Sequence, residues 1–576
     1  MHDTHALKAP VAIVGGGPVG MMLALFLDRH GVPVVLFNSE RTTRWHPKGN
    51  THNARTMEHY RRLGLSDGIR RLGLPADHPR DVAYFTRLNG WELARLDMPA
   101  ERERLQAARQ APDTDQVPEP LLRANQMYVE RFLLDHLRTR PGIQLRFGWR
   151  VDDFQQDADG VSLHAVDSAG QAADEHWRAD YLVGCDGGHS FVRRRLGIGY
   201  IGPDGSTGGF LSGRMFSSHV RIPDLHRRLL PDRKAWMYNV VAPEGRMLLI
   251  SLDGADEFLL MTQAHSHDEM PQDDAVIRAI QRGIGEPVEV SVLAHAVWHG
   301  GLALVAERFA DRRVLLAGDA THLFSPTGGF GMNTGIDGAA NLAWKLAAAV
   351  QGWAGDGLLA TYELERRPVT LRNTHAARRL TQRVGQVDVP AEVEDPGPAG
   401  QQARARLGEA LQQFRGQFAS LGVELGARYD GSPILWPDDG TPPEDDPLLY
   451  RPSTLPGGRL PHLWIADGST GRCSVFDRLG VGFTLLRNGP QAPEATRLVE
   501  AARARGIPLE VVDLPATAFT FYAVQLLLVR PDQHIGWRGD ALPEDAGALL
   551  DRLVGQGVAG IQAPGPVLGC VFSAVG

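Results

Sequence analysis

Short runs of apolar and β-branched residues alternate with helical periodicity along the first two thirds of the chain. The pattern predicts strands over 11–14 and 34–37 and helices over 55–65 and 129–137. Alternation of this kind, continuing to about residue 383, is typical of an α/β fold with inserted sheets.

The segment over 209–297 has a different pattern of apolar residues. Its apolar runs over 247–252 and 258–261 predict a sheet of its own. We therefore expect a second lobe with a mixed sheet, inserted into a first domain that spans 1–385.

After this domain the chain becomes rich in proline, glycine and acidic residues, which predicts a helical or extended connector over 386–455. A third α/β domain is expected over 456–576. Its predicted strands lie over 463–466, 483–486, 509–512 and 524–529, and its predicted helices over 493–505 and 543–554. Each of these two helices is expected to open on a proline, which is tolerated in a first helical turn.

Composition narrows the class of protein. A chain of 576 residues predicts two or three domains, and a net charge of −8 without a basic block argues against nucleic-acid binding. No signal peptide precedes the first strand, and no run of about 18 apolar residues is present. The three cysteines, Cys185, Cys473 and Cys570, fit a reducing compartment and exclude a cysteine-rich metal cluster. We expect a cytoplasmic protein with no membrane contact and no metal site.

The first candidate site is a glycine turn between a strand and a helix. Gly15, Gly17 and Gly20 form G-x-G-x-x-G directly after the strand over 11–14. Bare backbone N–H groups at a helix N-terminus can hold a dinucleotide pyrophosphate. A glycine turn that serves packing alone is the alternative. Asn38 ends the next strand, where a carboxylate normally meets the ribose.

The second candidate site follows an apolar run over 181–184. Asp186 stands on a tight turn, and the arginines over 193–195 follow it. Arg193 is the best single candidate for pinning an anionic group, with a solvated surface run as the alternative for any of the three arginines.

The third candidate site is the most specific. Gly318 and Asp319 follow an apolar strand over 314–317, which places a carboxylate where it can hold ribityl hydroxyls. The glycine-rich loop over 325–333 then enters a helix expected to begin near Thr334, whose N–H groups can stabilise negative charge on a reduced flavin. Three strand-end sites in this order indicate FAD rather than a transient NAD site.

The three motifs resemble those of the FAD-dependent aromatic hydroxylases, the class A flavoprotein monooxygenases of the p-hydroxybenzoate, phenol and chlorophenol hydroxylase type. Segments over 48–58, 123–130, 457–462 and 528–532 are similar to the phenol hydroxylase branch, so the resemblance spans almost the whole chain. It implies a Rossmann-like FAD-binding domain, an inserted substrate lobe and a C-terminal thioredoxin-like domain. Because Cys473 has no C-x-x-C partner, that domain is expected to be structural, as part of a homodimer contact.

The resemblance also implies which residues contact FAD. They are Gly15, Gly17, Pro18, Val19, Gly20, Asn38, Lys48, Arg123, Gln126, Asp186, Gly187, Gly318, Asp319, Pro326, Gly329, Gly331, Met332 and Asn333. Two of them depart from the family pattern, since Asn38 replaces an acid and Lys48 an arginine.

In this family NAD(P)H reduces FAD, O2 adds at the flavin C4a, and the resulting hydroperoxide transfers oxygen to an electron-rich ring. The substrate is therefore expected to be a small aromatic compound in a mostly apolar pocket. The candidate substrate contacts are Asn53, Trp236, Tyr238 and Pro326, and the candidate catalytic residues are His52, Tyr238 and the Pro326 carbonyl. His322 is expected to be a structural hydrogen bonder rather than a base.

Several alternatives stay open at this point. Lys48 and the arginines near Arg44 are compatible with a 2′-phosphate or with a solvated charge cluster, so the choice between NADH and NADPH is open. A larger polycyclic or polyketide substrate is an alternative to a simple phenol. A flavin halogenase is disfavoured because the chain has no W-x-W-x-I-P segment. A non-catalytic flavin- or ligand-binding protein is disfavoured by the intact loop over 328–333.

Overall fold

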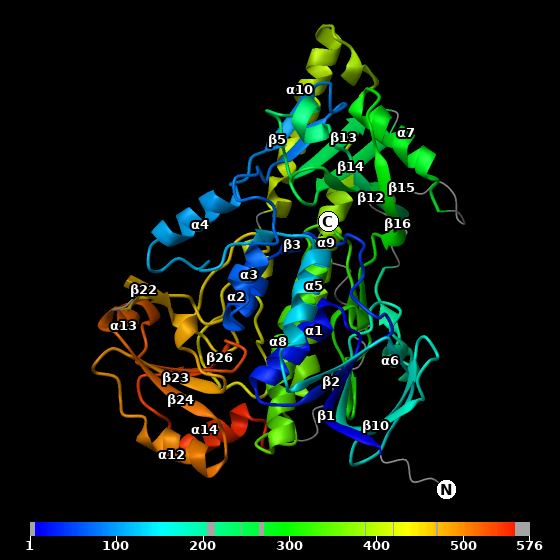
Figure 1. The fold of residues 1–576 in the computed structure, drawn as a ribbon. Coiled ribbons are helices and arrows are strands. Elements are labelled where there is room, and N and C mark those ends of the chain that lie inside the picture. The colour runs from blue at the N-terminus through cyan, green and yellow to red at the C-terminus, as the bar shows by residue number, and fades with distance from the viewer. Residues whose placement is uncertain are drawn as a thin grey trace.

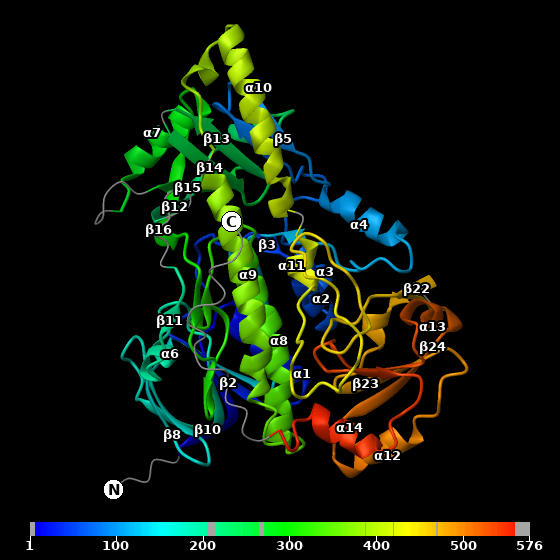
Figure 2. The ribbon, with the colours of Figure 1, turned by 180° about the vertical axis from the view of Figure 1, so that it is seen from behind.

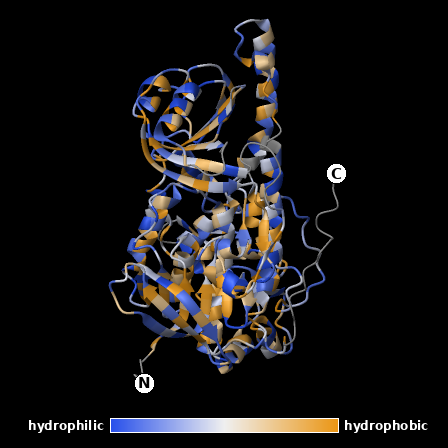
Figure 3. Ribbon diagram, turned by 90° about the vertical axis from the view of Figure 1, so that its right-hand side faces the viewer, coloured by the Kyte–Doolittle hydropathy of each residue, from blue (hydrophilic) through white to orange (hydrophobic). Residues whose placement is uncertain are grey.

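The structure, a computed structural model, describes residues 6–203, 213–243, 245–263, 270–385, 387–418, 420–467 and 471–558. The expected start of the inserted lobe at residue 209, and Cys570, lie outside these residues. Figure 3 shows apolar residues concentrated along the packed strands and helices.

The first sheet has eight strands and carries the predicted glycine turn (Figure 1). Its order is β18-β19-β10-β1-β2-β7, with β9 and β8 following β10 on a branch. The strands are β1 (Leu7–Val14), β2 (Val34–Asn38), β7 (Ile143–Phe147), β8 (Trp149–Gln156), β9 (Val161–Asp167), β10 (Glu175–Gly184), β18 (Ala310–Asp311) and β19 (Val314–Leu316). β19, β10, β1, β2 and β7 run parallel, so their carboxyl ends meet at one edge.

Helices pack on this sheet because they carry many apolar residues, which are buried against it. In α1 (Pro18–Arg29) nine consecutive residues from Val19 are buried. The helix packs against α5 (Gln126–Leu137) and α8 (Phe330–Gln351). α8 in turn packs against α2 (Ala54–Arg62) and α9 (Thr361–Gly385), as Figure 2 shows from behind.

The second sheet has seven strands in the order β16-β12-β15-β14-β13-β4-β5 and lies above the first in Figure 1. The strands are β4 (Val82–Phe85), β5 (Glu92–Leu96), β12 (Gly213–Arg221), β13 (Met237–Ala242), β14 (Gly245–Ser251), β15 (Glu257–Gln263) and β16 (Ser291–Gly300). The pair β13–β4 is parallel and the others are antiparallel, so the sheet is mixed. β4 and β5 join it from outside the range 209–297.

Two helices pack on this second sheet. Apolar residues of α7 (Asp273–Ile284) share one core with inward-facing residues of β4, β13, β14 and β15. Residues of α10 (Pro398–Gln412) belong to the core on the other face.

The C-terminal sheet has four strands in the order β24-β23-β25-β26. They are β23 (Phe483–Asn488), β24 (Leu509–Leu514), β25 (Leu526–Val529) and β26 (Ile535–Gly539), with helices α12 (Thr496–Ala504), α13 (Ala516–Tyr522) and α14 (Ala546–Leu553). The structure thus confirms strands in all four of the predicted regions, with β21 (Trp464–Asp467) in the region over 463–466, outside this sheet, and β23, β24 and β25 in the regions over 483–486, 509–512 and 524–529.

Both predicted proline starts in this region are wrong by three residues. The carbonyl of Pro493 accepts a hydrogen bond from the Arg487 side chain instead of starting a helix, and α12 begins at Thr496. α14 begins at Ala546 because the Asp545 side chain accepts from the N–H of Ala548 and caps it.

Shorter elements connect these units. They are β3 (Thr51–His52), β6 (Leu122–Arg123), β11 (Tyr200–Ile201), β17 (Leu304–Ala306), β20 (His322–Leu323), β21 (Trp464–Asp467), β22 (Gly471–Ser474), α3 (Ser66–Arg70), α4 (Glu101–Gln110), α6 (Phe191–Arg195), α11 (Leu421–Leu425), the π-helix η1 (Leu225–Leu229) and the 3₁₀ turns η2 (Gly318–Ala320), η3 (Ala391–Glu394), η4 (Gln413–Phe418) and η5 (Val475–Arg478).

Candidate functional site

The three predicted strand-end motifs lie side by side. Val14 at the end of β1 pairs with Gly184 of β10, and Gly184 pairs with Leu316 of β19. The loops that begin at Gly15, Cys185 and Ala317 therefore leave the sheet at one edge, which is where ligands bind in open α/β sheets.

Of the glycines in the first turn, only one is not required by close packing against other protein atoms. A Cβ on Gly15, which has φ +116°, would lie 2.2 Å from the Cys185 carbonyl oxygen, and one on Gly20 would lie 2.0 Å from the Gly15 carbonyl oxygen. A Cβ on Gly17 would meet no protein atom within 4 Å, although Gly17 caps α1. The packing alternative thus accounts for Gly15 and Gly20, whereas Gly17 fits a cradle for a ligand such as a pyrophosphate.

Asn38 holds the glycine turn from the end of β2. Its Oδ1 accepts a hydrogen bond of 3.2 Å from the Gly16 N–H, and its Nδ2 donates to the Glu40 carbonyl at 3.0 Å. Pro18 and Val19 begin α1, and the Val19 side chain lies where a Cβ on Gly318 would be 3.0 Å away. The first and third loops are therefore in contact.

Asp186 is engaged within its own loop. Its carboxylate accepts from the Ser190 hydroxyl at 2.5 Å and from the Val192 N–H at 3.1 Å, and burial raises its pKa. Gly187 follows at φ +83°, with open space where its Cβ would be.

The guanidinium of Arg193 contacts two groups of the protein. It donates to the Gly188 carbonyl at 2.9 Å and stacks 3.8 Å from the centre of the Tyr200 ring. The Tyr200 hydroxyl donates to the Asp319 carbonyl at 2.5 Å. Tyr200, which no motif indicated, therefore ties the second loop to the third.

Asp319 keeps its carboxylate open. The side chain is accessible to solvent, and no hydrogen-bond donor among the described residues reaches it. The surrounding protein raises the pKa of Asp319 by desolvation, and the charge of Lys48, an exposed side chain, opposes this shift. The carboxylate is therefore free to accept hydrogen bonds from a ligand.

The helix after the third loop begins earlier than predicted. α8 starts at Phe330 rather than near Thr334, because Gly329 adopts φ +68° and caps it. The N–H of Gly329 donates to the Pro326 carbonyl at 3.0 Å, and a Cβ on Gly331 would meet nothing closer than 3.7 Å. Gly331 and Met332 thus lie in the first turn of a 22-residue helix, where N–H groups lack helical partners.

Asn333 fastens this loop to the segment before α2. Its Nδ2 donates to the carbonyls of Thr51 at 2.9 Å and Gly329 at 2.6 Å, and its Oδ1 accepts from the Asn53 N–H at 3.0 Å. The Asn53 side chain in turn accepts from the Thr56 N–H and caps α2. The structure therefore brings together Asn53, Asn333 and the loop of Pro326.

Arg123 and Gln126 lie beside this junction. Arg123 donates to the Thr51 hydroxyl and stacks 3.9 Å from the centre of the Trp236 ring. Gln126 donates to Glu130 at 2.5 Å, and its backbone N–H donates to the Gly49 carbonyl. Both side chains are thus engaged with protein groups.

The two candidate histidines are buried and neutral. His52 pairs with the Tyr60 hydroxyl at 3.1 Å, and burial lowers its pKa to about 4. Burial lowers the pKa of His322 to about 3, and its ring lies edge-on to Phe324. Neither ring is a strong base at neutral pH, which agrees with a structural interpretation of His322.

Tyr238 lies on the face of the second sheet that packs against α7. It belongs to the core beneath α7, and its hydroxyl accepts from the Ala235 N–H at 2.7 Å and pairs with His226 at 2.8 Å. Trp236, which precedes β13, belongs to the core on the other face. Tyr238 is therefore not carried into the proposed function.

The part of the chain that the structure describes shows neither a metal-ion cluster nor a membrane-spanning helix. No group of three or more histidine, cysteine, aspartate or glutamate side chains there is placed to hold a metal ion. No helix in the same ranges is long and apolar enough to cross a bilayer.

Known proteins resemble this chain over nearly its full length. It is 33% identical to the FAD-dependent monooxygenase apdD of Emericella nidulans, over 95% of this chain and 89% of that protein. It is 30% identical to the phenol 2-monooxygenase of Pseudomonas sp. strain EST1001, over 96% and 94%. The solved structure of chromopyrrolic acid-soaked RebC with bound 7-carboxy-K252c superposes with a TM-score of 0.84 at 35% identity, over 96% and 99%.

Two family models match separate parts of the chain. Residues 453–557 match the C-terminal domain of aromatic-ring hydroxylases. Residues 8–377, more than half of the chain, match the FAD binding domain. The chain therefore belongs to the FAD-dependent aromatic-ring hydroxylases and is a flavoprotein monooxygenase, an oxidoreductase enzyme.

Proposed function

We propose that this enzyme uses NADH or NADPH together with O2 to hydroxylate a phenolic ring. The observation that carries the proposal is the meeting of three strand-end loops at one sheet edge, where Gly17 faces open space and Asp319 keeps an unengaged carboxylate. Bound FAD would supply the hydride acceptance and oxygen transfer that side chains lack.

The chain's own groups would hold FAD at three points. Gly17 lets the pyrophosphate approach the N-terminus of α1. Asp319 accepts hydrogen bonds from ribityl hydroxyls. The N–H groups of Gly331 and Met332, in the first turn of α8, would stabilise negative charge on the reduced flavin.

The other proposed cofactor residues hold the loops that FAD touches. Asn38, Gln126 and Asp186 already bond to protein groups, so we assign them to positioning the adenosine side. Arg123 and Asn333 hold the segment at Thr51. Lys48 is the exposed cation of the set, and its proposed role is to meet an anionic group of FAD or of NADPH.

On the substrate side, Asn53, Trp236 and the Pro326 carbonyl are the groups that remain. The Pro326 oxygen accepts from Gly329 with one lone pair and has a second for a substrate hydroxyl. His52 packs behind this segment as a neutral ring, so its proposed role is to shape the pocket and exclude water rather than to accept a proton.

A larger polycyclic substrate is the second candidate. The likeness to RebC with bound 7-carboxy-K252c, at 35% identity over 96% of this chain, supports this alternative. Under either candidate the reaction class is the same.

We also propose the finer architecture. The parallel order β19-β10-β1-β2-β7 supports a Rossmann-like domain, and the order β24-β23-β25-β26, with β23 and β24 parallel, supports a thioredoxin-like domain. The proposed domains are 1–385, 386–455 and 456–576, and the proposed assembly is a cytoplasmic homodimer. Light scattering on the purified protein would test the assembly, and a monomeric mass would contradict it.

The experiment that tests the function follows NADH and NADPH oxidation by the purified protein across a panel of phenols and fused-ring aromatic compounds. We expect one compound to stimulate oxidation and to yield a product heavier by one oxygen atom. A protein that binds no FAD, or that binds FAD without stimulation by any compound of either class, would contradict the proposal.

A further inference from the structure

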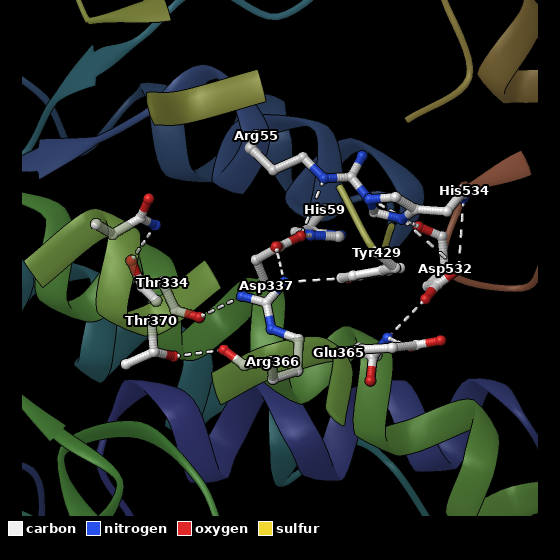
Figure 4. Close-up of polar contacts among 12 residues, drawn as sticks. Arg55, His59, Thr334, Asp337, Glu365, Arg366, Thr370, Tyr429, Asp532 and His534 are labelled. Carbon is white, nitrogen blue, oxygen red and sulfur yellow. Dashed lines mark hydrogen bonds and ion pairs between the residues drawn. The ribbon is translucent and has the colours of Figure 1, made fainter. Parts of the chain in front are cut away.

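A buried junction joins the C-terminal sheet to the helices that carry the flavin-facing loop (Figure 4). The hairpin loop between β25 and β26 contains Arg530, Asp532 and Gln533, all of them buried. Arg530 forms two hydrogen bonds of 2.7 Å to Glu365 of α9. Asp532 accepts from Asn341 of α8 at 2.9 Å. The loop is therefore inserted between the helices rather than laid on their surface.

Arg55 is the point where this loop meets α2 and α8. Its guanidinium donates to the Gln533 side-chain oxygen at 2.7 Å and to the Asp532 carbonyl at 2.8 Å. The same group donates to Asp337 of α8 at 3.1 Å and to Glu58 of α2 at 2.9 Å. A single side chain thus joins three segments.

The N-terminal ends of both helices lie at the proposed flavin site. Asp337 is seven residues after the start of α8, and Arg55 is two residues after the Asn53 cap of α2. Asn333 bonds to Asn53 one turn before the Asp337–Arg55 contact. The relative position of α2 and α8 is therefore set on the flavin side by Asn333 and Asn53. On the side of the C-terminal loop it is set by Asp337, which bonds to both Arg55 and His59 of α2.

The backbone conformation of Gln533 is a second, independent observation. It has φ +67°, and among the described residues only Arg312 and Ala523 share a positive φ without being glycine. A left-handed backbone favours glycine, so a glutamine held there indicates that its side chain is needed. Among the described residues, the hydrogen-bond partner of that side chain is Arg55.

We propose that Gln533 is a positioning residue of the flavin site, acting through Arg55 and Asp337 on the α2–α8 pair that holds the loop of Pro326 to Asn333. The inference rests on the proposed function, because it assigns FAD to that loop. Under this proposal, the C-terminal sheet helps to position the cofactor site.

The test is the substitution Gln533→Gly in the full-length holoprotein. Glycine relieves the left-handed backbone while it removes the amide, and Arg55 keeps Glu58 and Asp337 as partners. We expect the melting temperature of the FAD-free protein to fall by a few degrees at most, because relief of the left-handed backbone partly offsets the lost hydrogen bond, and FAD to dissociate about fivefold faster or more, measured by the rise of free-flavin fluorescence on dilution.

Two further variants separate positioning from general stability. Ala523→Gly relieves the same backbone strain at φ +57°, on an exposed residue of the same sheet unit, and is expected to leave FAD dissociation unchanged. Gln533→Glu keeps an acceptor for Arg55 and is expected to restore slow dissociation. Rapid dissociation from Gln533→Glu as well would overturn the proposal, because it would show that the acceptor is not what matters.

The outcomes also distinguish this inference from the function on which it rests. A wild-type protein that binds no FAD would overturn the proposed function and this inference with it. A wild-type protein that binds FAD, with Gln533→Gly releasing it at the wild-type rate, would overturn the inference alone.

Discussion

The flavin-facing edge and the buried junction use charged groups in opposite ways. At the edge, the solvent-accessible carboxylate of Asp319 has no donor among the described residues, and desolvation by the surrounding protein raises its pKa. At the junction, burial also opposes ionisation of Glu365, but the charges of Arg530 and Lys345 outweigh it and lower the pKa to about 2. A group kept open is available to a ligand, whereas a group that is fully paired fixes the packing of helices.

The largest expected effect is at the buried junction, where the charged groups are paired. Glu365→Ala leaves the buried cations of Arg530 and Lys345 without their shared carboxylate, so we expect the free energy of unfolding to fall by about 3–5 kcal/mol. Urea unfolding measures this, with Glu409→Ala on the exposed face of α10 as the control, expected within about 0.5 kcal/mol of wild type. A loss for Glu365→Ala no larger than for the control would break the comparison.

Glu424 sharpens the comparison because it is buried without a paired arginine. It accepts from the Ala54 N–H at 2.9 Å, and burial raises its pKa from 4.5 to about 7. Since the folded pKa is raised, the folded state holds the proton more tightly than the unfolded chain does. Stability should therefore fall as pH rises from about 4.5 to 7, by up to about 3 kcal/mol.

The variant Glu424→Gln tests this pH dependence. The amide oxygen can still accept from Ala54, so we expect unfolding measured between pH 5 and pH 8 to lose that slope and to show higher stability than wild type at pH 8. Parallel pH profiles for the two proteins would show that Glu424 is ionised throughout this range.

The same contrast explains what could be predicted from the sequence. The three strand-end loops were predictable because an apolar run followed by glycine or Gly-Asp is a local pattern, and parallel strands bring such ends together. The junction was not, because Arg55 and Gln533 are 478 positions apart and neither belongs to a local pattern. The family resemblance indicated the segment over 528–532 but not what it contacts.

The errors have local physical causes. Proline permits a first helical turn but does not require one, so the starts at Pro493 and Pro543 were placed too early. Gly329 caps α8 at a left-handed angle, which brings the helix start forward from Thr334 to Phe330. The orientation of Arg193 toward Tyr200 depends on a strand that no motif marked.

At the open end of the comparison, Asp319→Ala should weaken FAD binding by about 10-fold to 100-fold, the loss of hydrogen bonds to a charged group. The melting temperature of the FAD-free protein should be unchanged, because no protein donor among the described residues loses a partner. The absorbance ratio of flavin to protein after gel filtration measures retention. Full FAD occupancy in the variant would remove Asp319 from the proposed site.

The smallest expected effect tests the two faces of the second sheet. Tyr238→Phe removes the partner of the Ala235 N–H and of His226 in the core beneath α7, so we expect a loss of about 1 kcal/mol in the free energy of unfolding. FAD retention and the ratio of hydroxylated product to NAD(P)H consumed should not change, because Tyr238 lies on the far face from Trp236. Trp236→Phe is the matched variant on the near face, where the ring stacks on Arg123, and it should change that ratio. If Tyr238→Phe alters the ratio as much as Trp236→Phe does, the packed face of the sheet also affects the substrate. The contrast between groups open to a ligand and groups packed in the interior would then fail for this sheet.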